Sequence, residues 1–223
     1  FRVVNKNVVI YDPLQNIYYV PKSKIIDKYT YINLDFEGFQ SFFVLFSNDE
    51  LKNCIELSQN KVISEITLKT LWNVRFFNKI ENEEFEIQID SLKSWTEFND
   101  DKIKYFSGTA LYSGKIKISK INKNNRVYLD LGKVYNIAEI YVNRKYVSTL
   151  WIMPYKVDVT NYLIKGENYI EIYVTNTWFN RFKKELNLQS QNPNIKFFTS
   201  FDIKGDLENS GLIGPVKLLF KIK

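Results

Sequence analysis

The chain has 223 residues, of which 45% are hydrophobic and 16% aromatic, and its formal net charge is +6. This composition supplies enough apolar surface for a core and argues against disorder, and the length suits one large or two small domains. Because the sequence has no histidine and one cysteine, Cys54, it excludes Ser-His-Asp and Cys-His nucleophile systems, imidazole bases, and histidine or thiolate metal sites.

The charge pattern argues against nucleic acid and membrane partners. The 31 lysines and arginines are scattered among 25 acidic residues, which predicts a solvated surface rather than the clustered basic face that a phosphate backbone requires. No hydrophobic stretch approaches the ~20 residues of a membrane-spanning helix. The chain begins at Phe1 rather than methionine, which suggests a processed protein or a fragment, so its compartment is unknown.

The first 50 residues read as the end of a β-domain. They contain four alternating runs separated by turn signals, at residues 7–11, 17–20, 29–36 and 39–46. Four strands offer too little sequence to close a two-layer core alone, so further strands are expected upstream. Residues 51–61 are polar and are predicted to be a linker, with a short helix as an option at residues 51–58.

Residues 62–223 predict an all-β fold, an antiparallel β-sandwich of the jelly-roll kind. The rhythm is that of short β-rich runs bounded by turns, and no helix of more than two turns is expected. The expected strands are residues 65–77, 85–89, 108–118, 127–131, 137–142, 146–151, 169–175, 196–202 and 216–222. In the strand 169–175, Ile170, Ile172 and Val174 should face inward.

Several motifs of this second part resemble those of a known family. They are Asp130-Leu-Gly132, Ala138-Glu-Ile-Tyr-Val-Asn143, Leu150-Trp-Ile-Met-Pro154-Tyr155 and Val174-Thr-Asn-Thr-Trp-Phe-Asn-Arg181, supported by residues 92–96, 103–110 and 210–216. Together they resemble the galactose-binding-like, glycoside hydrolase family 2 sugar-binding-type jelly roll that is attached to many glycoside hydrolases. The resemblance is greatest to the C-terminal region of glycoside hydrolase family 106, the α-L-rhamnosidase-type enzymes, and runs from about residue 40 onward.

The resemblance implies a non-catalytic role. In that family the catalytic carboxylates and their metal belong to an upstream barrel domain, which no part of this chain matches, so we expect no turnover from this chain alone. The expected partners are that catalytic domain of the same polypeptide and a plant-type or bacterial glycan. No cofactor is expected, although such sandwiches commonly hold a structural calcium ion, and the implied location is periplasmic or extracellular.

Candidate sugar-binding residues lie at the predicted strand ends. Sugar sites use aromatic faces together with amides and arginine, and the residues of these types are Trp151, Tyr155, Asn176, Trp178, Asn180 and Arg181. Several of these residues also have a structural interpretation. Trp151 and Trp72 suit a core, Trp178 could be covered by residues 187–194, and Asn180 and Arg181 could satisfy loop carbonyls. The alternative functions are a purely structural sandwich and a stand-alone lectin-like module.

Two departures from the family pattern stand out. Similar sequences tend to have Asn-Gly at the hairpin where this one has Asn143-Arg144, which gives up the residue best suited to positive φ. Relatives usually follow Asn-Arg with Gly-Asp, whereas this chain continues Phe182-Lys-Lys-Glu185. If that acid has a binding role, Glu185 is the residue to which it would have moved.

Overall fold

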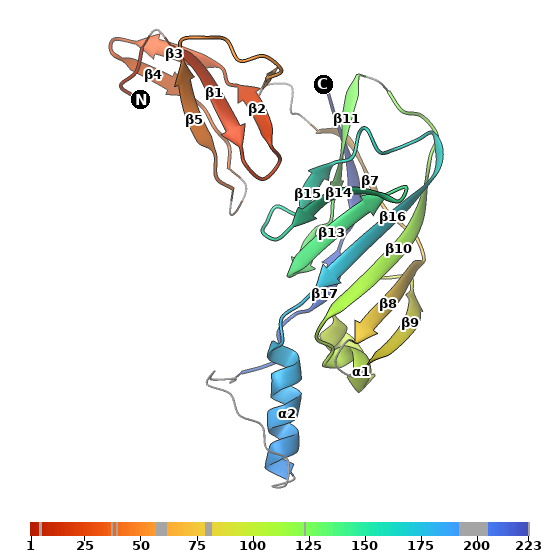
Figure 1. The fold of residues 1–223 in the computed structure, drawn as a ribbon. Coiled ribbons are helices and arrows are strands. Elements are labelled where there is room, and N and C mark those ends of the chain that lie inside the picture. The colour runs from red at the N-terminus through yellow and green to blue at the C-terminus, as the bar shows by residue number, and fades with distance from the viewer. Residues whose placement is uncertain are drawn as a thin grey trace.

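The computed structural model describes residues 1–56, 62–78, 82–191 and 205–222, apart from residues 5, 37, 39 and 123. The protein is all-β, and Figure 1 shows a small β-unit at the N-terminal end joined to a larger β-sandwich. The predicted all-β class and antiparallel sandwich are therefore confirmed.

The N-terminal unit is built around the β1–β2 hairpin. Its four-stranded sheet has the order β5-β1-β2-β6, and a separate hairpin joins β3 to β4. The strands are β1 (Asn7–Asp12), β2 (Ile17–Val20), β3 (Ser23–Ile26), β4 (Tyr29–Ile32), β5 (Phe43–Ser47) and β6 (Ile55–Glu56). β6 pairs in parallel with β2, so a strand lies where the sequence predicted a linker or a helix. The division of the chain at residues 51–61 stays a prediction.

The larger part packs a six-stranded sheet against a four-stranded sheet. The six-stranded sheet has the order β14-β13-β16-β10-β8-β9, with β8 (Trp72–Asn78), β9 (Glu83–Ile89), β10 (Thr109–Ile118), β13 (Ile137–Val142), β14 (Lys145–Leu150) and β16 (Gly166–Thr175). The four-stranded sheet has the order β15-β11-β18-β7, with β7 (Val62–Thr67), β11 (Asn125–Asp130), β15 (Lys156–Asp158) and β18 (Lys217–Ile222). A third pair joins β12 (Lys133–Tyr135) to β17 (Gly211–Gly214).

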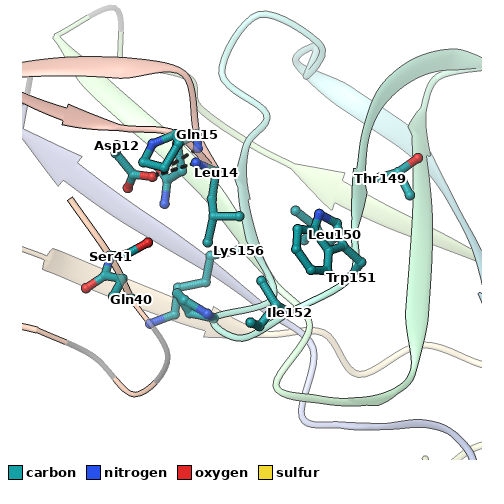
Figure 2. A pocket seen from close by; sticks show the side chains of 12 residues that line it. Asp12, Leu14, Gln15, Gln40, Ser41, Thr149, Leu150, Trp151, Ile152 and Lys156 are labelled. Carbon is teal, nitrogen blue, oxygen red and sulfur yellow. Dashed lines mark hydrogen bonds between the residues drawn. The ribbon is translucent and has the colours of Figure 1, made fainter. Parts of the chain in front are cut away.

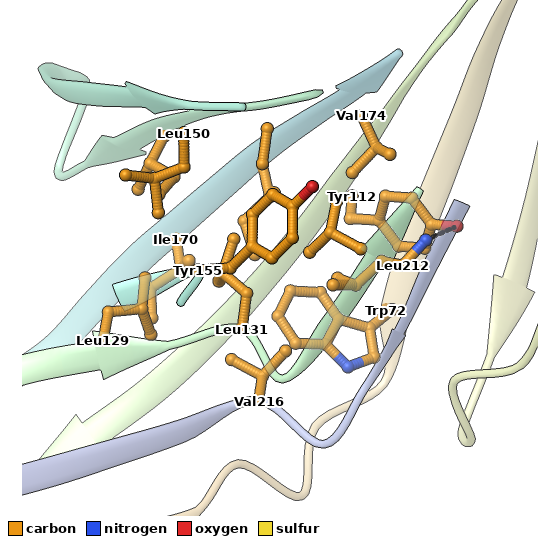
Figure 3. Close-up of a cluster of buried hydrophobic side chains, with 14 of the residues drawn as sticks. Trp72, Tyr112, Leu129, Leu131, Leu150, Tyr155, Ile170, Val174, Leu212 and Val216 are labelled. Carbon is orange, nitrogen blue, oxygen red and sulfur yellow. Dashed lines mark hydrogen bonds between the residues drawn. The ribbon is translucent and has the colours of Figure 1, made fainter. Parts of the chain in front are cut away.

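The core lies between the two large sheets. Ile170, Ile172 and Val174 of β16 are buried in it, as their alternation predicted. Figure 3 shows Trp72 of β8 beside Leu212 of β17 and near Leu131 and Val216, which flank strands of the four-stranded sheet. Trp72 is 2% exposed, so its interpretation as a core residue is confirmed.

One predicted strand is two strands. The run at residues 65–77 divides into β7, which joins the four-stranded sheet, and β8, which joins the six-stranded sheet. The segment between them crosses from one layer to the other, and the Leu68 amide there donates to the Val216 carbonyl at 2.8 Å. A continuous series of β-forming residues gives no sign of such a crossing. The predicted strand at 196–202 lies outside the described residues.

The expectation of no long helix is wrong. α2 (Phe179–Gln191) has 13 residues and extends away from the sandwich (Figure 1), whereas α1 (Asp101–Lys104) and the 3₁₀ helix Trp95–Glu97 are single turns. The α2 sequence is rich in Lys, Glu and Leu, which favour helix, and Arg181 pairs with Glu185 one turn later at 2.8 Å. Phe179, Phe182 and Leu186 stand at i, i+3 and i+7, a helical spacing that the prediction of an all-strand segment missed.

The two β-units contact each other through the outer face of the four-stranded sheet. Val127 and Leu129 of β11 face the core, so Tyr128 faces the opposite way, yet Tyr128 is also buried. Tyr19 of β2 is buried as well, and the two phenol groups interact. Burial raises the pKa of both tyrosines, and the approach of each to neighbouring acidic groups adds to this effect. The N-terminal unit therefore covers part of this sheet.

Candidate functional site

The predicted site residues gather at one end of the six-stranded sheet. In the register of the strands, Ala138 at the start of β13 pairs with Leu150 at the end of β14 and with Val174 near the end of β16. Leu150 and Val174 are thus two strand spacings apart, about 10 Å. The loops that carry Trp151 and Trp178 follow directly, so the sheet brings the two tryptophans to the same end.

Asn176 lies inside this end of the sheet rather than on it. Its Nδ2 donates to the Phe106 carbonyl at 2.8 Å and to Ser210 Oγ at 3.3 Å, while its Oδ1 accepts from the Gly108 amide at 3.0 Å. The residue is 9% exposed. Its polar atoms hold together three segments that are far apart in the sequence.

Asn180, the second residue of α2, has the same kind of role. Its Nδ2 donates to the Glu208 carbonyl at 2.7 Å and to Ser210 Oγ at 3.1 Å, and its Oδ1 accepts from the Glu208 amide at 2.9 Å. Only 1% of the residue is exposed. The structure therefore matches the loop-satisfying interpretation of Asn180, and neither asparagine lies on an open surface.

The two tryptophans are exposed. Trp151 is 64% exposed, so its interpretation as a core residue is wrong: the chain bends after Leu150 and turns the indole outward. Trp178 is 50% exposed and lies 5.8 Å from the Phe182 ring, centroid to centroid. The covering loop expected at residues 187–194 is helical as far as Gln191. Both indoles thus have the accessibility that stacking on a sugar requires.

Tyr155 and Arg181 are less accessible. Tyr155 is buried in the core, where Figure 3 shows its ring, and its hydroxyl donates to the Asn136 carbonyl at 2.5 Å. Burial raises its pKa. Arg181 is partly buried, and its Nε donates to Glu185 Oε1 at 2.8 Å, so Glu185 serves as an ion-pair partner within α2. Arg181 also borders a cavity of about 40 Å³, room for little more than a water molecule.

A larger cleft opens beside Trp151. It has a volume of about 340 Å³ and lies between the N-terminal unit and the loop after β14, as Figure 2 shows. The lining residues are Asp12, Pro13, Leu14, Gln15, Gln40 and Ser41 from the N-terminal unit, and Thr149, Leu150, Trp151, Ile152, Pro154 and Lys156 from the sandwich. The sequence analysis found Trp151 but none of the residues on the opposite wall.

Metal binding and catalysis are two further roles that the acidic side chains of the described residues could have. That part of the chain contains no cluster of three or more His, Cys, Asp or Glu side chains placed to hold a metal ion, and the structural calcium ion stays a prediction. The acids of the β8–β9 hairpin pair with neighbours: Glu84 with Arg75, and Glu83 with Lys102 at 2.7 Å. None of the described helices is long and apolar enough to cross a membrane.

The sandwich and its loop end define a class of protein. Residues 88–207, more than half of the chain, match the model of the glycosyl hydrolase 2 galactose-binding domain-like family, and the chain belongs to that family. This confirms the resemblance to the sugar-binding-type jelly roll of glycoside hydrolases.

One sequence relative and two solved structures show which proteins the chain is similar to. A protein of Formosa agariphila, named as a candidate beta-glucuronidase, is 38% identical in an alignment 179 residues long, which covers 69% of this chain and 15% of that protein. A rhamnosidase from Novosphingobium sp. PP1Y has a similar structure over 99% of this chain and 21% of its own, with a TM-score of 0.80 and 29% identity. A beta-D-glucuronidase from Dictyoglomus thermophilum, with a TM-score of 0.52 and 19% identity over 74% of this chain and 29% of its own, shares the fold. The chain thus spans about a fifth or less of the first two relatives.

Proposed function

We propose that the chain is a non-catalytic accessory region of a larger glycoside hydrolase of the family 106 type, acting on rhamnose-containing glycans. The observation that supports this most is the likeness to the Novosphingobium rhamnosidase, which extends over almost the whole chain and includes the N-terminal unit as well as the sandwich. The glucuronidase of known structure is similar over a smaller share of the chain.

The described carboxylates support a role outside catalysis. Glycoside hydrolysis normally needs two carboxyl groups about 5–10 Å apart across an open substrate site. The most acidic segment of the described chain is the β8–β9 hairpin, where Glu83, Glu84 and Glu86 each have a cationic or amide partner on the surface. The catalytic pair would therefore belong to another part of the polypeptide.

The exposed tryptophans support contact with the glycan. An indole presents a flat apolar face at little cost in conformational entropy, which suits the apolar face of a sugar ring. Trp151 and Trp178 leave the same end of the sheet, so a glycan lying along that end could reach both.

Enzymatic and binding assays on the 223-residue chain test the proposal. We expect no hydrolysis of aryl α-L-rhamnosides, and measurable binding of rhamnose-containing oligosaccharides in a calorimetric titration. Turnover that survives purification and is abolished by substitution of a carboxylate within the chain would contradict the non-catalytic role.

A purely structural region is the second candidate, and the buried asparagines favour it. Asn176 and Asn180 are of the residue types that bind sugars, yet their amides hold loops together. If no rhamnose-containing oligosaccharide binds while the chain folds cooperatively, this second function is the better description.

A further inference from the structure

The cleft between the two β-units has the features of a small-ligand site. Its volume of about 340 Å³ lies at the lower end of the roughly 300–1,000 Å³ that ligand sites occupy. We propose that the cleft binds a single neutral sugar ring, with Trp151 as the stacking platform and Gln15 as a hydroxyl acceptor. The inference rests on the accessory role proposed above and assigns half of the site to the N-terminal unit.

Trp151 provides the apolar wall. It follows the buried Leu150 at the end of β14, and the residues after it, including Pro154, are not in a strand, so the indole is left outside both sheets. In Figure 2 the indole lies on the sandwich side of the cleft, with Leu14 and Gln15 on the opposite side. A ring between them could place its apolar face on the indole and its hydroxyl groups toward the amide.

Gln15 provides an unsatisfied polar atom. Its Oε1 is buried and has no hydrogen-bond partner among the residues that the structure describes. Buried acceptors in native proteins almost always have a partner, so this atom calls for a donor from water or from a ligand. Because Oε1 is inaccessible as it stands, a sugar hydroxyl group in the cleft would supply that donor once the Gln15 side chain rotates toward it.

The position of Gln15 is fixed by the turn that carries it. Asp12 Oδ1 accepts from the backbone amides of Leu14 and Gln15 at 2.9 and 3.1 Å, which holds the β1–β2 turn in one conformation. The neighbouring contact between Tyr19 and Tyr128 joins this unit to the sandwich. The backbone of this wall and its attachment to the sandwich are therefore fixed without a ligand, so binding should cost little conformational entropy of the backbone there.

The charges of the cleft favour a neutral ligand. The charged lining residues are Asp12 and Lys156, and Lys156 Nζ lies 3.7 Å from Asp130 Oδ2, outside the cleft. Burial raises the pKa of Asp12, which shows that its carboxylate is poorly solvated. A second carboxylate placed beside it, as in a uronic acid, would be repelled, and Lys156 is already shared with Asp130.

Four variants of the 223-residue chain separate the cleft from the rest of the surface. Trp151→Ala removes the platform, Gln15→Leu removes the acceptor at similar volume, and Trp178→Ala removes the other exposed tryptophan. Tyr169→Ala is the control, because this exposed tyrosine of β16 does not line the cleft. Affinity is measured by ligand-observed NMR with methyl α-L-rhamnoside, methyl β-D-galactoside and methyl β-D-glucuronide. Thermal unfolding of each variant confirms that it is folded.

We expect at least one neutral glycoside to bind with millimolar affinity, weakened about tenfold or more by Trp151→Ala and several-fold by Gln15→Leu. Tyr169→Ala should change the affinity less than about twofold. Binding that is lost in Trp178→Ala and kept in Trp151→Ala would overturn the cleft while leaving a sugar-binding accessory role in place. Absence of binding by wild type would overturn both the cleft proposal and the sugar-binding accessory role. A glucuronide that binds as tightly as the neutral glycosides would overturn the proposed preference for a neutral ligand.

Discussion

The two ends of the six-stranded sheet use the same residue type for the same purpose. At the β13–β14 hairpin, Asn143 Nδ2 donates to the Tyr162 carbonyl and to Asn168 Oδ1 at 2.8 and 2.9 Å, and Asn168 holds both backbone groups of Ile164. At the opposite end, Asn176 and Asn180 hold the segments around Phe106 and Ser210. Each end thus fixes its loops with a pair of buried or partly buried amides.

The ends differ in what lies beside the amides. The hairpin exposes Arg144 and Lys145, whereas the opposite end exposes Trp151 and Trp178 and borders the cleft. Asparagine at a strand end is therefore a poor indicator of sugar binding in this fold, because an amide fits a loop carbonyl as well as a hydroxyl group. The exposed indole is the better indicator, since burial would have been favourable for it.

The largest expected effect is on stability and should be alike at both ends. Asn176→Ala leaves the Phe106 carbonyl and the Gly108 amide without their partner, and Asn168→Ala does the same to Ile164. Each change should lower the free energy of unfolding by about 2–4 kcal/mol. Urea denaturation of both variants measures this, and a loss below about 1 kcal/mol at either position would break the comparison.

The next effect concerns Tyr112, a buried tyrosine of β10. Tyr112 Oη accepts from Trp95 Nε1 at 2.6 Å and from the Leu212 amide at 3.2 Å, so Tyr112→Phe leaves two buried donors unpaired. The cost should be about 1–3 kcal/mol near neutral pH.

The difference in stability between wild type and Tyr112→Phe should depend on pH. Burial raises the pKa of Tyr112 from 10.0 to about 12. Because the unfolded state then loses its proton first, the advantage of wild type over Tyr112→Phe is fully present below about pH 10 and declines up to about pH 12. Unfolding measured across this range would contradict the assignment if the difference were constant.

A smaller effect is expected at the exposed tryptophans. A fully buried tryptophan costs about 3–5 kcal/mol when it is truncated to alanine. Trp178 is half exposed, so Trp178→Ala should lower stability by only about 1 kcal/mol. Differential scanning calorimetry tests this, with Trp72→Ala as the buried counterpart. A large shift for Trp178→Ala would restore the structural interpretation of this end.

The smallest effect belongs to the hairpin. Asn143 and Arg144 have φ values of 52° and 64°, in the left-handed region that glycine adopts without steric cost. Arg144→Gly should therefore raise the free energy of unfolding by about 0.5–1 kcal/mol. Arg144→Ala is the control, because alanine keeps the Cβ atom and should bring no gain. Equal stability of the two variants in guanidinium denaturation would show that the turn is unstrained.

Much of the fold could be predicted from local patterns. The alternation in β16 placed Ile170, Ile172 and Val174 in the core because a strand with one buried face repeats every two residues, and Ile140 and Val142 of β13 are buried in the same pattern. The strands β12, β15 and β17 have only three or four residues, too few to show a period. The crossing between β7 and β8 had no clear periodic signal either.

The candidate site was harder to predict because its partners are distant in sequence. Whether Asn180 faces a sugar or a loop depends on Glu208 and Ser210, 28 and 30 residues away. The cleft beside Trp151 depends on Gln15, which lies on another β-unit. Residue type indicated the right end of the sandwich, but tertiary contacts decided which side chains are exposed there.

The position of β18 has a consequence for biosynthesis. β18 is an inner strand, paired with β11 on one side and with β7 on the other, and Leu218 pairs with Ile66 about 150 residues earlier. The four-stranded sheet cannot close until residues 217–222 have been synthesised, so β7 and β11 lack their shared neighbour while the residues between them and β18 are made. A nascent chain that ends before β18 should therefore expose two unpaired strand edges, which are prone to pair with other chains.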